Sequence, residues 1–167
     1  MAWQDDVWSV LKAQEIRQVA YVPDAGHSLL IRKAHADPAV AATVLTTEEE
    51  GVALCSGAWL GGDRSVLLMQ SSGVGNCINM LSMIETLKIP FLTLVTMRGD
   101  YAEFNPWQIP MGKATETVLA AMGLLVRSVE RPEDAADMVD SAARLAFHSH
   151  QGVAVLLRQR LIGRKDF

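Results

Sequence analysis

The sequence predicts a doubly wound α/β fold, in which helices cover both faces of a mainly parallel six-stranded sheet. Two observations lead to this fold class. Segments with helical spacing of apolar residues alternate with short apolar runs along all 167 residues. These runs are almost continuously apolar, as strands buried on both faces are. Half of the residues are hydrophobic, which suffices for the core of a single domain over residues 1–167.

The elements follow one another in strict alternation. Apolar spacing predicts helices over residues 3–17, 27–36, 47–60, 75–87, 113–122 and 132–150. Short apolar runs predict strands over residues 19–23, 42–45, 65–70, 91–97, 124–129 and 152–158. Pro90 breaks the helix that precedes the fourth strand. The basic tail, residues 158–167, is expected to be a solvated end or a subunit contact.

Composition narrows the class of protein. The net charge of -4 argues against a nucleic-acid or anionic-membrane partner, and no apolar run reaches the length of a membrane span. The acidic, amphipathic N-terminus does not resemble a signal peptide. Cys55 and Cys77 lie in apolar surroundings without a Cys-x-x-Cys pattern. We therefore expect two reduced thiols, no metal site and a cytoplasmic location.

Polar and glycine residues gather directly after the strands. In an open parallel sheet the ligand binds beyond the carboxyl ends of the strands, so these segments form the candidate site. In segment 22–28, Asp24 suits a helix cap, and His27 is a candidate for acid–base chemistry or anion contact. Segment 98–110 is long for a plain connection, and it contains Arg98 and Gln108. These two are candidates for contact with an anionic substrate, with ordinary solvation as the alternative.

Three consecutive acids, Glu48 to Glu50, open the third predicted helix. Acids in a first turn offset the positive end of the helix dipole, and Thr47 with Glu50 fits a capping box. Capping explains one or two of the acids. The helix then continues with many small residues, Gly57 among them, which permit close packing of a ligand or a second chain.

The glycine-rich segment 70–76 fits neither of the common phosphate motifs. Gly73 and Gly75 are not followed by the third glycine of a dinucleotide fingerprint, and the Gly-Lys-Ser/Thr ending of a phosphate loop is missing. The glycines allow close approach to the backbone, and the alternative is a simple tight turn.

Four motifs together resemble the pyrimidine-binding (PYR) domain of thiamine-diphosphate-dependent enzymes. Glu48 stands nine residues before Gly57, as a glutamate stands before a glycine in that family. Segment 69–76 is similar to the family's Met-Gln-Asn-Ser-Gly-Leu-Gly-Asn, and segment 22–26 to its Val-Pro-Asp-Ser. Arg98-Gly99 followed by residues 108–112 is similar to its Arg-Gly and Gln-x-Pro-Met-Gly. The likeness is greatest to sulfopyruvate decarboxylase α subunits and phosphonopyruvate decarboxylases.

The resemblance implies a role for each matched residue. Glu48 is the expected catalytic residue, which hydrogen-bonds the aminopyrimidine ring and so activates the cofactor. The expected cofactor-binding residues are Glu48, Ser72, Gly73, Val74 and Asn76. The expected substrate contacts are Asp24, His27, Arg98 and Gln108.

The resemblance also implies a cofactor and partners. The cofactor is thiamine diphosphate, and its Mg²⁺ is expected on a separate diphosphate-binding β subunit, because Gly62-Asp63-Arg64 is a poor match to the family's Gly-Asp-Gly. Self-association is expected through helices 47–60 and 75–87.

The implied reaction is decarboxylation of a small 2-oxo acid such as sulfopyruvate or phosphonopyruvate, giving an aldehyde and CO₂. Ser71 and segment 25–27 depart from the family pattern, so the choice of acid stays open. Two other readings also remain. One is carboligation or 2-hydroxyacyl cleavage with the same cofactor, and the other is a non-catalytic binding or regulatory module.

Overall fold

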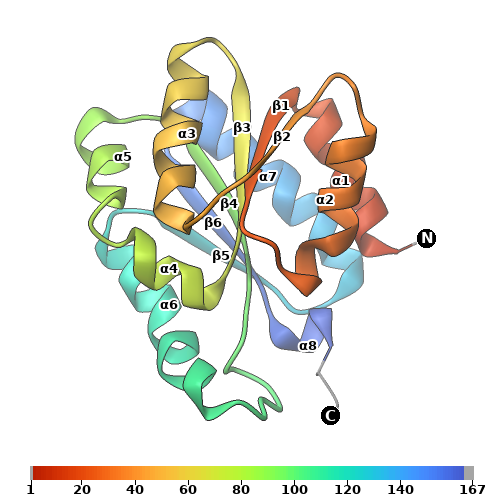
Figure 1. The fold of residues 1–167 in the computed structure, drawn as a ribbon, viewed down its shortest axis with the longest axis vertical. Coiled ribbons are helices and arrows are strands. Elements are labelled where there is room, and N and C mark those ends of the chain that lie inside the picture. The colour runs from red at the N-terminus through yellow and green to blue at the C-terminus, as the bar shows by residue number, and fades with distance from the viewer. Residues whose placement is uncertain (1, 164–167) are drawn as a thin grey trace.

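A computed structural model describes residues 2–163 and contains one sheet of six strands in the order β2-β1-β3-β4-β6-β5 (Figure 1). All neighbouring strands pair in parallel. The strands are β1 (Ile16–Tyr21), β2 (Ala41–Val44), β3 (Arg64–Gln70), β4 (Phe91–Thr96), β5 (Leu125–Val129) and β6 (Gly152–Leu157). The predicted six-stranded, doubly wound fold is confirmed.

Helices cover both faces of the sheet. They are α1 (Trp3–Ala13), α2 (Ser28–Ala36), α3 (Glu48–Leu60), α4 (Ser71–Cys77), α5 (Leu81–Leu87), α6 (Ile109–Ala121), α7 (Ala135–Ser149) and the short α8 (Gln159–Ile162). Helices α1, α2 and α7 lie on one side, and α3 to α6 lie on the other (Figure 1). The sheet therefore separates two apolar cores.

Side chains alternate between these two cores along each central strand. In β3, Val66 and Leu68 face the core under α1, α2 and α7, whereas Leu67 and Met69 face the core under α3 to α6. All four side chains are fully buried. This two-sided burial explains why the middle of β3, from Val66 to Met69, is entirely apolar.

The first helix ends earlier than the predicted residue 17. Ala13 is its last residue, and Glu15 takes a left-handed conformation with φ 60° before β1 begins at Ile16. The buried Ile16 fits the helical spacing of the preceding segment, but it belongs to the strand. At such a boundary, a single apolar residue cannot distinguish the apolar periodicity of a helix from that of a strand.

The predicted helix over residues 75–87 is two helices in the structure. α4 begins at Ser71, directly after Gln70 ends β3, and α5 begins at Leu81. The glycine-rich segment is therefore the first turns of a helix, and the tight-turn alternative is wrong. Glycine has a poor helix propensity, which tertiary packing overrides here.

The chain also differs from expectation in two places near its carboxyl end. α6 begins at Ile109, within the predicted irregular stretch. The tail contains α8, and its first residue, Gln159, is buried and accepts a hydrogen bond from the Tyr101 N–H at 3.1 Å. The expectation of a solvated end is therefore wrong for Gln159, whereas Arg160 is exposed, and residues 164–167 lie outside the described part of the chain.

Candidate active site

Glu48 lies at the first turn of α3 and is 8% exposed. Its Oε2 accepts a hydrogen bond of 2.9 Å from the Nδ2 of Asn76 on α4. Its Oε1 has no hydrogen-bond partner among residues 2–163. A nearly buried carboxyl group with one oxygen held by an amide and the other free is suited to bind a donor on a ligand.

Gly73 makes room for this carboxyl group. A Cβ atom built at residue 73 would lie 2.4 Å from Cδ and from Oε1 of Glu48. Real Cβ contacts are not this short, so any side chain here would displace the glutamate. Gly73 therefore leaves a notch in the surface of α4, that is, a space for the carboxyl group of Glu48. Asn76, one turn later, holds this carboxyl group by its hydrogen bond.

The other two acids of the triplet have simpler roles. Glu49 is exposed. Glu50 accepts a 2.8 Å hydrogen bond from the backbone N–H of Thr46, while the Thr47 side chain makes no capping bond. The predicted capping box is therefore wrong, because Glu50 accepts from the N–H of Thr46 and not from that of the N-cap residue Thr47.

A second acid, Asp24, lies on the segment after β1 and accepts three hydrogen bonds. Its Oδ1 accepts from Gln70 Nε2 at 2.9 Å. Its Oδ2 accepts from the Thr96 hydroxyl at 2.8 Å and from the Gly26 N–H at 3.0 Å. Burial by itself raises the pKa of Asp24, but the Thr96 bond, the nearby His27 and the other hydrogen bonds outweigh it, so the pKa lies below its ordinary value. Asp24 is therefore ionised at neutral pH.

Glu48 and Asp24 face the same hollow. It has a volume of about 130 Å³ and is lined by Val22, Pro23, Asp24, Glu48, Gln70 and Ser72. The hollow lies at the carboxyl ends of β1 and β3, where ligands of open parallel sheets bind. The structure thus brings together Asp24, Glu48 and Ser72 of the predicted site residues.

His27 is placed where it cannot contact a substrate directly. Its ring is 0% exposed, and Nε2 lies 3.2 Å from the Met69 carbonyl and 3.1 Å from the Leu94 carbonyl. Nε2 must carry the proton, because both partners are acceptors. Burial lowers the pKa of His27 more than the neighbouring Asp24 raises it, so the ring is neutral. The ring ties the first segment to β3 and β4, and substrate contact or proton delivery by His27 stays a prediction that this burial does not favour.

Arg98 is also occupied by a partner in its own chain. Its Nε lies 2.5 Å from Oε2 of Glu103, and a second bond joins its Nη2 to Oε1. Both side chains of this pair are almost fully buried. The prediction that Arg98 binds an anionic substrate is therefore not supported, because a bidentate carboxylate already satisfies its guanidinium group.

Glu103 organises the long segment after β4. Besides Arg98, it accepts hydrogen bonds from Gln159 at 2.9 Å and from the backbone N–H groups of Asn105 at 3.0 Å and Gly99 at 3.2 Å. The Arg98 bond, with the others, lowers the pKa of Glu103 from 4.5 to about 2. One carboxylate thus joins both ends of this segment and the start of α8.

We expect Glu103→Gln to destabilise the chain by about 3 kcal/mol, because it removes one partner of a buried ion pair. The carboxylate of Glu103 has a lowered pKa in the folded state, so its stabilisation is complete above its ordinary pKa of 4.5 and is lost as the pH falls towards about 2. Urea unfolding at several pH values measures the difference between the two proteins. A difference that stays constant between pH 4.5 and 2 would contradict this assignment.

Two further predicted site residues, Val74 and Gln108, lie outside the lining of the hollow. Val74 is fully buried in the core between α4 and the sheet, and its contact with the cofactor stays a prediction. Gln108 ends a one-turn 3-10 helix, and its Oε1 is buried without a partner among the described residues. Its contact with substrate stays a prediction.

Sequence reasoning missed Gln70 and Thr96, which both hydrogen-bond Asp24. Each is a polar residue that ends its strand directly after apolar residues, and this is a signal that the sequence contains. It also missed Glu103, because no local pattern links an acid in an irregular segment to an arginine five residues before it.

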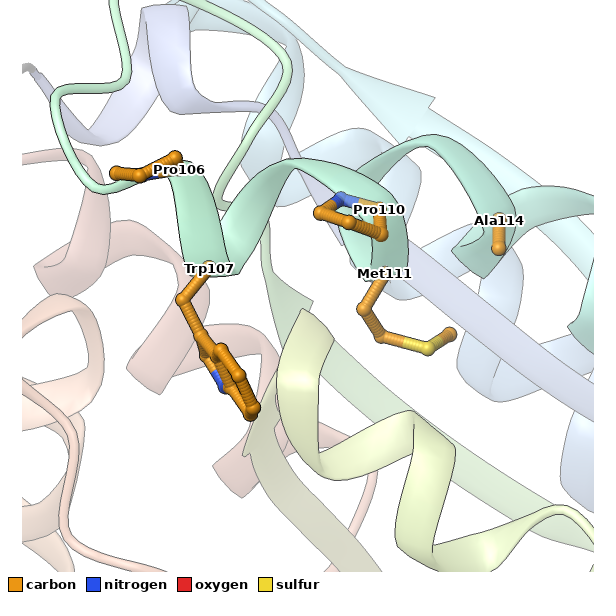
Figure 2. A pocket seen from close by; sticks show the side chains of 5 residues that line it. All are labelled: Pro106, Trp107, Pro110, Met111 and Ala114. Atoms are coloured by element: carbon orange, nitrogen blue, oxygen red, sulfur yellow. The ribbon is translucent and has the colours of Figure 1, made fainter.

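An apolar surface hollow lies beside this site (Figure 2). It has a volume of about 710 Å³ and is lined by Pro106, Trp107, Pro110, Met111 and Ala114. Figure 2 shows the Trp107 ring extending from the one-turn 3-10 helix of residues 106–108, just before the helix α6 that carries Pro110, Met111 and Ala114. Trp107 is 84% exposed, which is unusual for so large an apolar side chain.

The fold of this chain has a counterpart among solved structures. The fold is similar to 2-oxoglutarate:ferredoxin oxidoreductase from Magnetococcus marinus, with a TM-score of 0.80, 19% identity, and coverage of 97% of this chain and 29% of that chain. No family model matches the chain.

The sequence relatives define the family. Sulfopyruvate decarboxylase subunit alpha of Methanococcus maripaludis is 36% identical over 140 residues, which are 83% of this chain and 84% of that protein. Phosphonopyruvate decarboxylase of Streptomyces viridochromogenes is 34% identical over 116 residues, 68% of this chain and 29% of that protein. The chain belongs to the family of sulfopyruvate decarboxylase alpha subunits, so the family expected from its motifs is confirmed.

Proposed function

We propose that the chain is the pyrimidine-binding α subunit of a thiamine-diphosphate-dependent decarboxylase. Its substrate is a small 2-oxo acid of the sulfopyruvate or phosphonopyruvate type, and its products are CO₂ and an aldehyde. The relatives named as decarboxylases support this function. The single observation that carries it is the carboxyl group of Glu48, which is almost buried and keeps one oxygen free beside a polar hollow.

The residues present fit a thiamine-type cofactor. Glu48 supplies a free carboxyl oxygen for a ring nitrogen, and the absence of a side chain at Gly73 leaves space for that carboxyl group. Thiamine diphosphate, when bound, supplies the electron sink for decarboxylation. Glu48 would hold a proton at the ring nitrogen, while Ser72 and Asp24 line the hollow beside it.

A partner subunit completes the proposed site. We assign binding of the diphosphate and Mg²⁺ to a separate β subunit, since Gly62-Asp63-Arg64 is the nearest approach to a Gly-Asp-Gly motif. Exposed apolar side chains support association with other chains. They are Leu60 at the end of α3, Leu87 at the end of α5, and Trp107 in the apolar hollow.

We expect Trp107→Ala to weaken assembly with the β subunit about 30-fold, which corresponds to about 2 kcal/mol for an exposed aromatic anchor. The isolated chain should unfold at an unchanged urea concentration, because Trp107 is 84% exposed there. Analytical ultracentrifugation of the mixed subunits measures the first effect. Unaltered assembly would remove Trp107 from the interface.

The location proposed for the enzyme is the cytoplasm. Cys55 and Cys77 are free and buried, and burial raises the pKa of each thiol to about 12, which suits reduced cysteines in a reducing compartment. Within residues 2–163, no helix has the length and apolar character needed to cross a membrane.

Reconstitution tests the function. The chain is coexpressed with the diphosphate-binding subunit from the same genome, and CO₂ release is followed with sulfopyruvate, phosphonopyruvate and pyruvate. We expect release only in the presence of both subunits, thiamine diphosphate and Mg²⁺. An assembled complex that releases no CO₂ from any of the three acids would refute the proposal. Product analysis separates simple decarboxylation from carboligation.

A further inference from the structure

Gln70 connects two of the polar groups that line the site. It is the last residue of β3, and its side chain lies in the hollow with Asp24 and Glu48. Its Nε2 donates to Asp24 Oδ1 at 2.9 Å, and its Oε1 accepts from the Ser72 hydroxyl at 2.9 Å. An amide with both ends engaged cannot rotate without losing a hydrogen bond. Gln70 therefore fixes the direction of both neighbours.

The two acids of the hollow each have an amide of their own. Asn76 donates to Glu48, and Gln70 donates to Asp24. Both amides come from one stretch of chain, the last residue of β3 and the helix α4 that follows. Each acid therefore has a separate amide donor, and no hydrogen bond among the described residues joins the two carboxyl groups directly.

Asp24 keeps capacity for one more donor. Its Oδ2 accepts from Thr96 and Gly26, while its Oδ1 accepts from Gln70 alone. An ionised carboxylate offers about four acceptor positions, so Oδ1 has one position left for a bound molecule.

Resting on the proposed function, we propose that Gln70 is a positioning residue for decarboxylation. It holds Asp24 as an ionised hydrogen-bond acceptor that faces the hollow, beside but separate from Glu48. Through Asp24, it sets the acidic limb of the dependence of kcat/KM on pH.

The other charged and titratable groups around Asp24 do not replace Gln70 in this role. His27 is buried and hydrogen-bonded to two backbone carbonyls. Arg98 is engaged by Glu103. Glu48, across the hollow, is held by Asn76. Gln70 and Thr96 therefore remain as the side chains that donate directly to Asp24.

The first experiment measures the Asp24 carboxyl group itself, by ¹³C NMR titration of the full chain. Gln70→Glu keeps the size of the side chain but places a second carboxylate against Asp24, so the Asp24 pKa should rise by at least about one unit, a tenfold change in proton affinity. Gln70→Met removes the donor without adding charge and should produce a smaller rise. An unchanged Asp24 pKa in both variants would overturn the proposal.

A matched control is available on β1. Gln18 donates from Nε2 to Asp63 Oδ2 at 2.9 Å, well before the carboxyl end of the strand. Gln18→Glu therefore makes the same chemical change to a glutamine–aspartate pair outside the site. It should leave the Asp24 pKa and the rate of decarboxylation unchanged, and a shift equal to that of Gln70→Glu would count against a local effect.

The second experiment uses the assembled decarboxylase with sulfopyruvate. The acidic limb of kcat/KM should move to higher pH in Gln70→Glu by the shift seen for Asp24, and the substitution should cause no further shift in an Asp24→Asn background. An Asp24 pKa that moves while the acidic limb stays fixed would overturn the positioning role. A wild-type assembly without CO₂ release would instead refute the proposed function, while the NMR titration still tests the link between Gln70 and Asp24.

Discussion

Replacement of Glu48 by glutamine should lower the rate of decarboxylation by about 10²–10⁴-fold, the usual contribution of a positioned acid–base group. The amide keeps the size of the side chain and can still accept the hydrogen bond from Asn76, so the fold and the assembly should persist. It cannot supply the second carboxylate oxygen that lies beside the hollow. CO₂ release by the reconstituted complex measures the effect.

Glu49→Gln is the matched control for this experiment. Glu49 is the adjacent residue in the first turn of α3, and it carries the same charge, but it is exposed. Its substitution should leave the rate unchanged. If the two variants lost activity equally, or if Glu48→Gln assembled normally with an undiminished rate, the assignment of Glu48 would be wrong.

Gly73→Ala should have the second largest effect, a loss of about 100-fold in decarboxylation. The added Cβ atom would lie 2.4 Å from the carboxyl group of Glu48, so that group must move by the order of an ångström. Misplacement of a catalytic group by this distance costs about 10²-fold. The rate of the assembled enzyme and a crystal structure of the variant measure the two consequences.

Gly57→Ala provides a control for helix propensity. Both glycines lie in helices, but a Cβ atom at Gly57 would meet nothing within 4 Å. The isolated chain should therefore gain about 0.5–1 kcal/mol from Gly57→Ala, because alanine favours the helix. Gly73→Ala should show no such gain. Equal stabilisation by the two substitutions, with activity preserved, would contradict the role of Gly73 as a notch.

The fold could be predicted from the sequence because its central strands are buried on both faces. Such strands are rich in apolar residues, and β4, for example, is buried along its whole length. The first and last residues of the helices and strands were harder to predict than the elements themselves. Ile16 shows the reason, because an apolar residue at the junction of a helix and a strand fits the pattern of both. The start of α4 was missed because Gly73 and Gly75 have poor helix propensities, and the packing of Glu48 is a tertiary effect.

Only part of the candidate site could be predicted, because its contacts join residues that are far apart in the sequence. Glu48 and Asn76 are 28 residues apart, and a family resemblance placed both near the cofactor before the structure showed their hydrogen bond. His27 and Arg98 were expected to contact substrate because charged or titratable residues often do so in such segments. Neither burial of the His27 ring nor the pairing of Arg98 with Glu103 has a local signal in the sequence.

The direct passage from β3 into α4 has a consequence for how members of this family diversify. Gln70 ends the strand and Ser71 begins the helix, so no connecting residue separates them, and one inserted residue would rotate Gly73 and Asn76 away from Glu48. Length changes are therefore tolerated poorly on this side of the site. The segment between β4 and α6 is constrained in a different way, by the hydrogen bonds that Glu103 accepts near both of its ends.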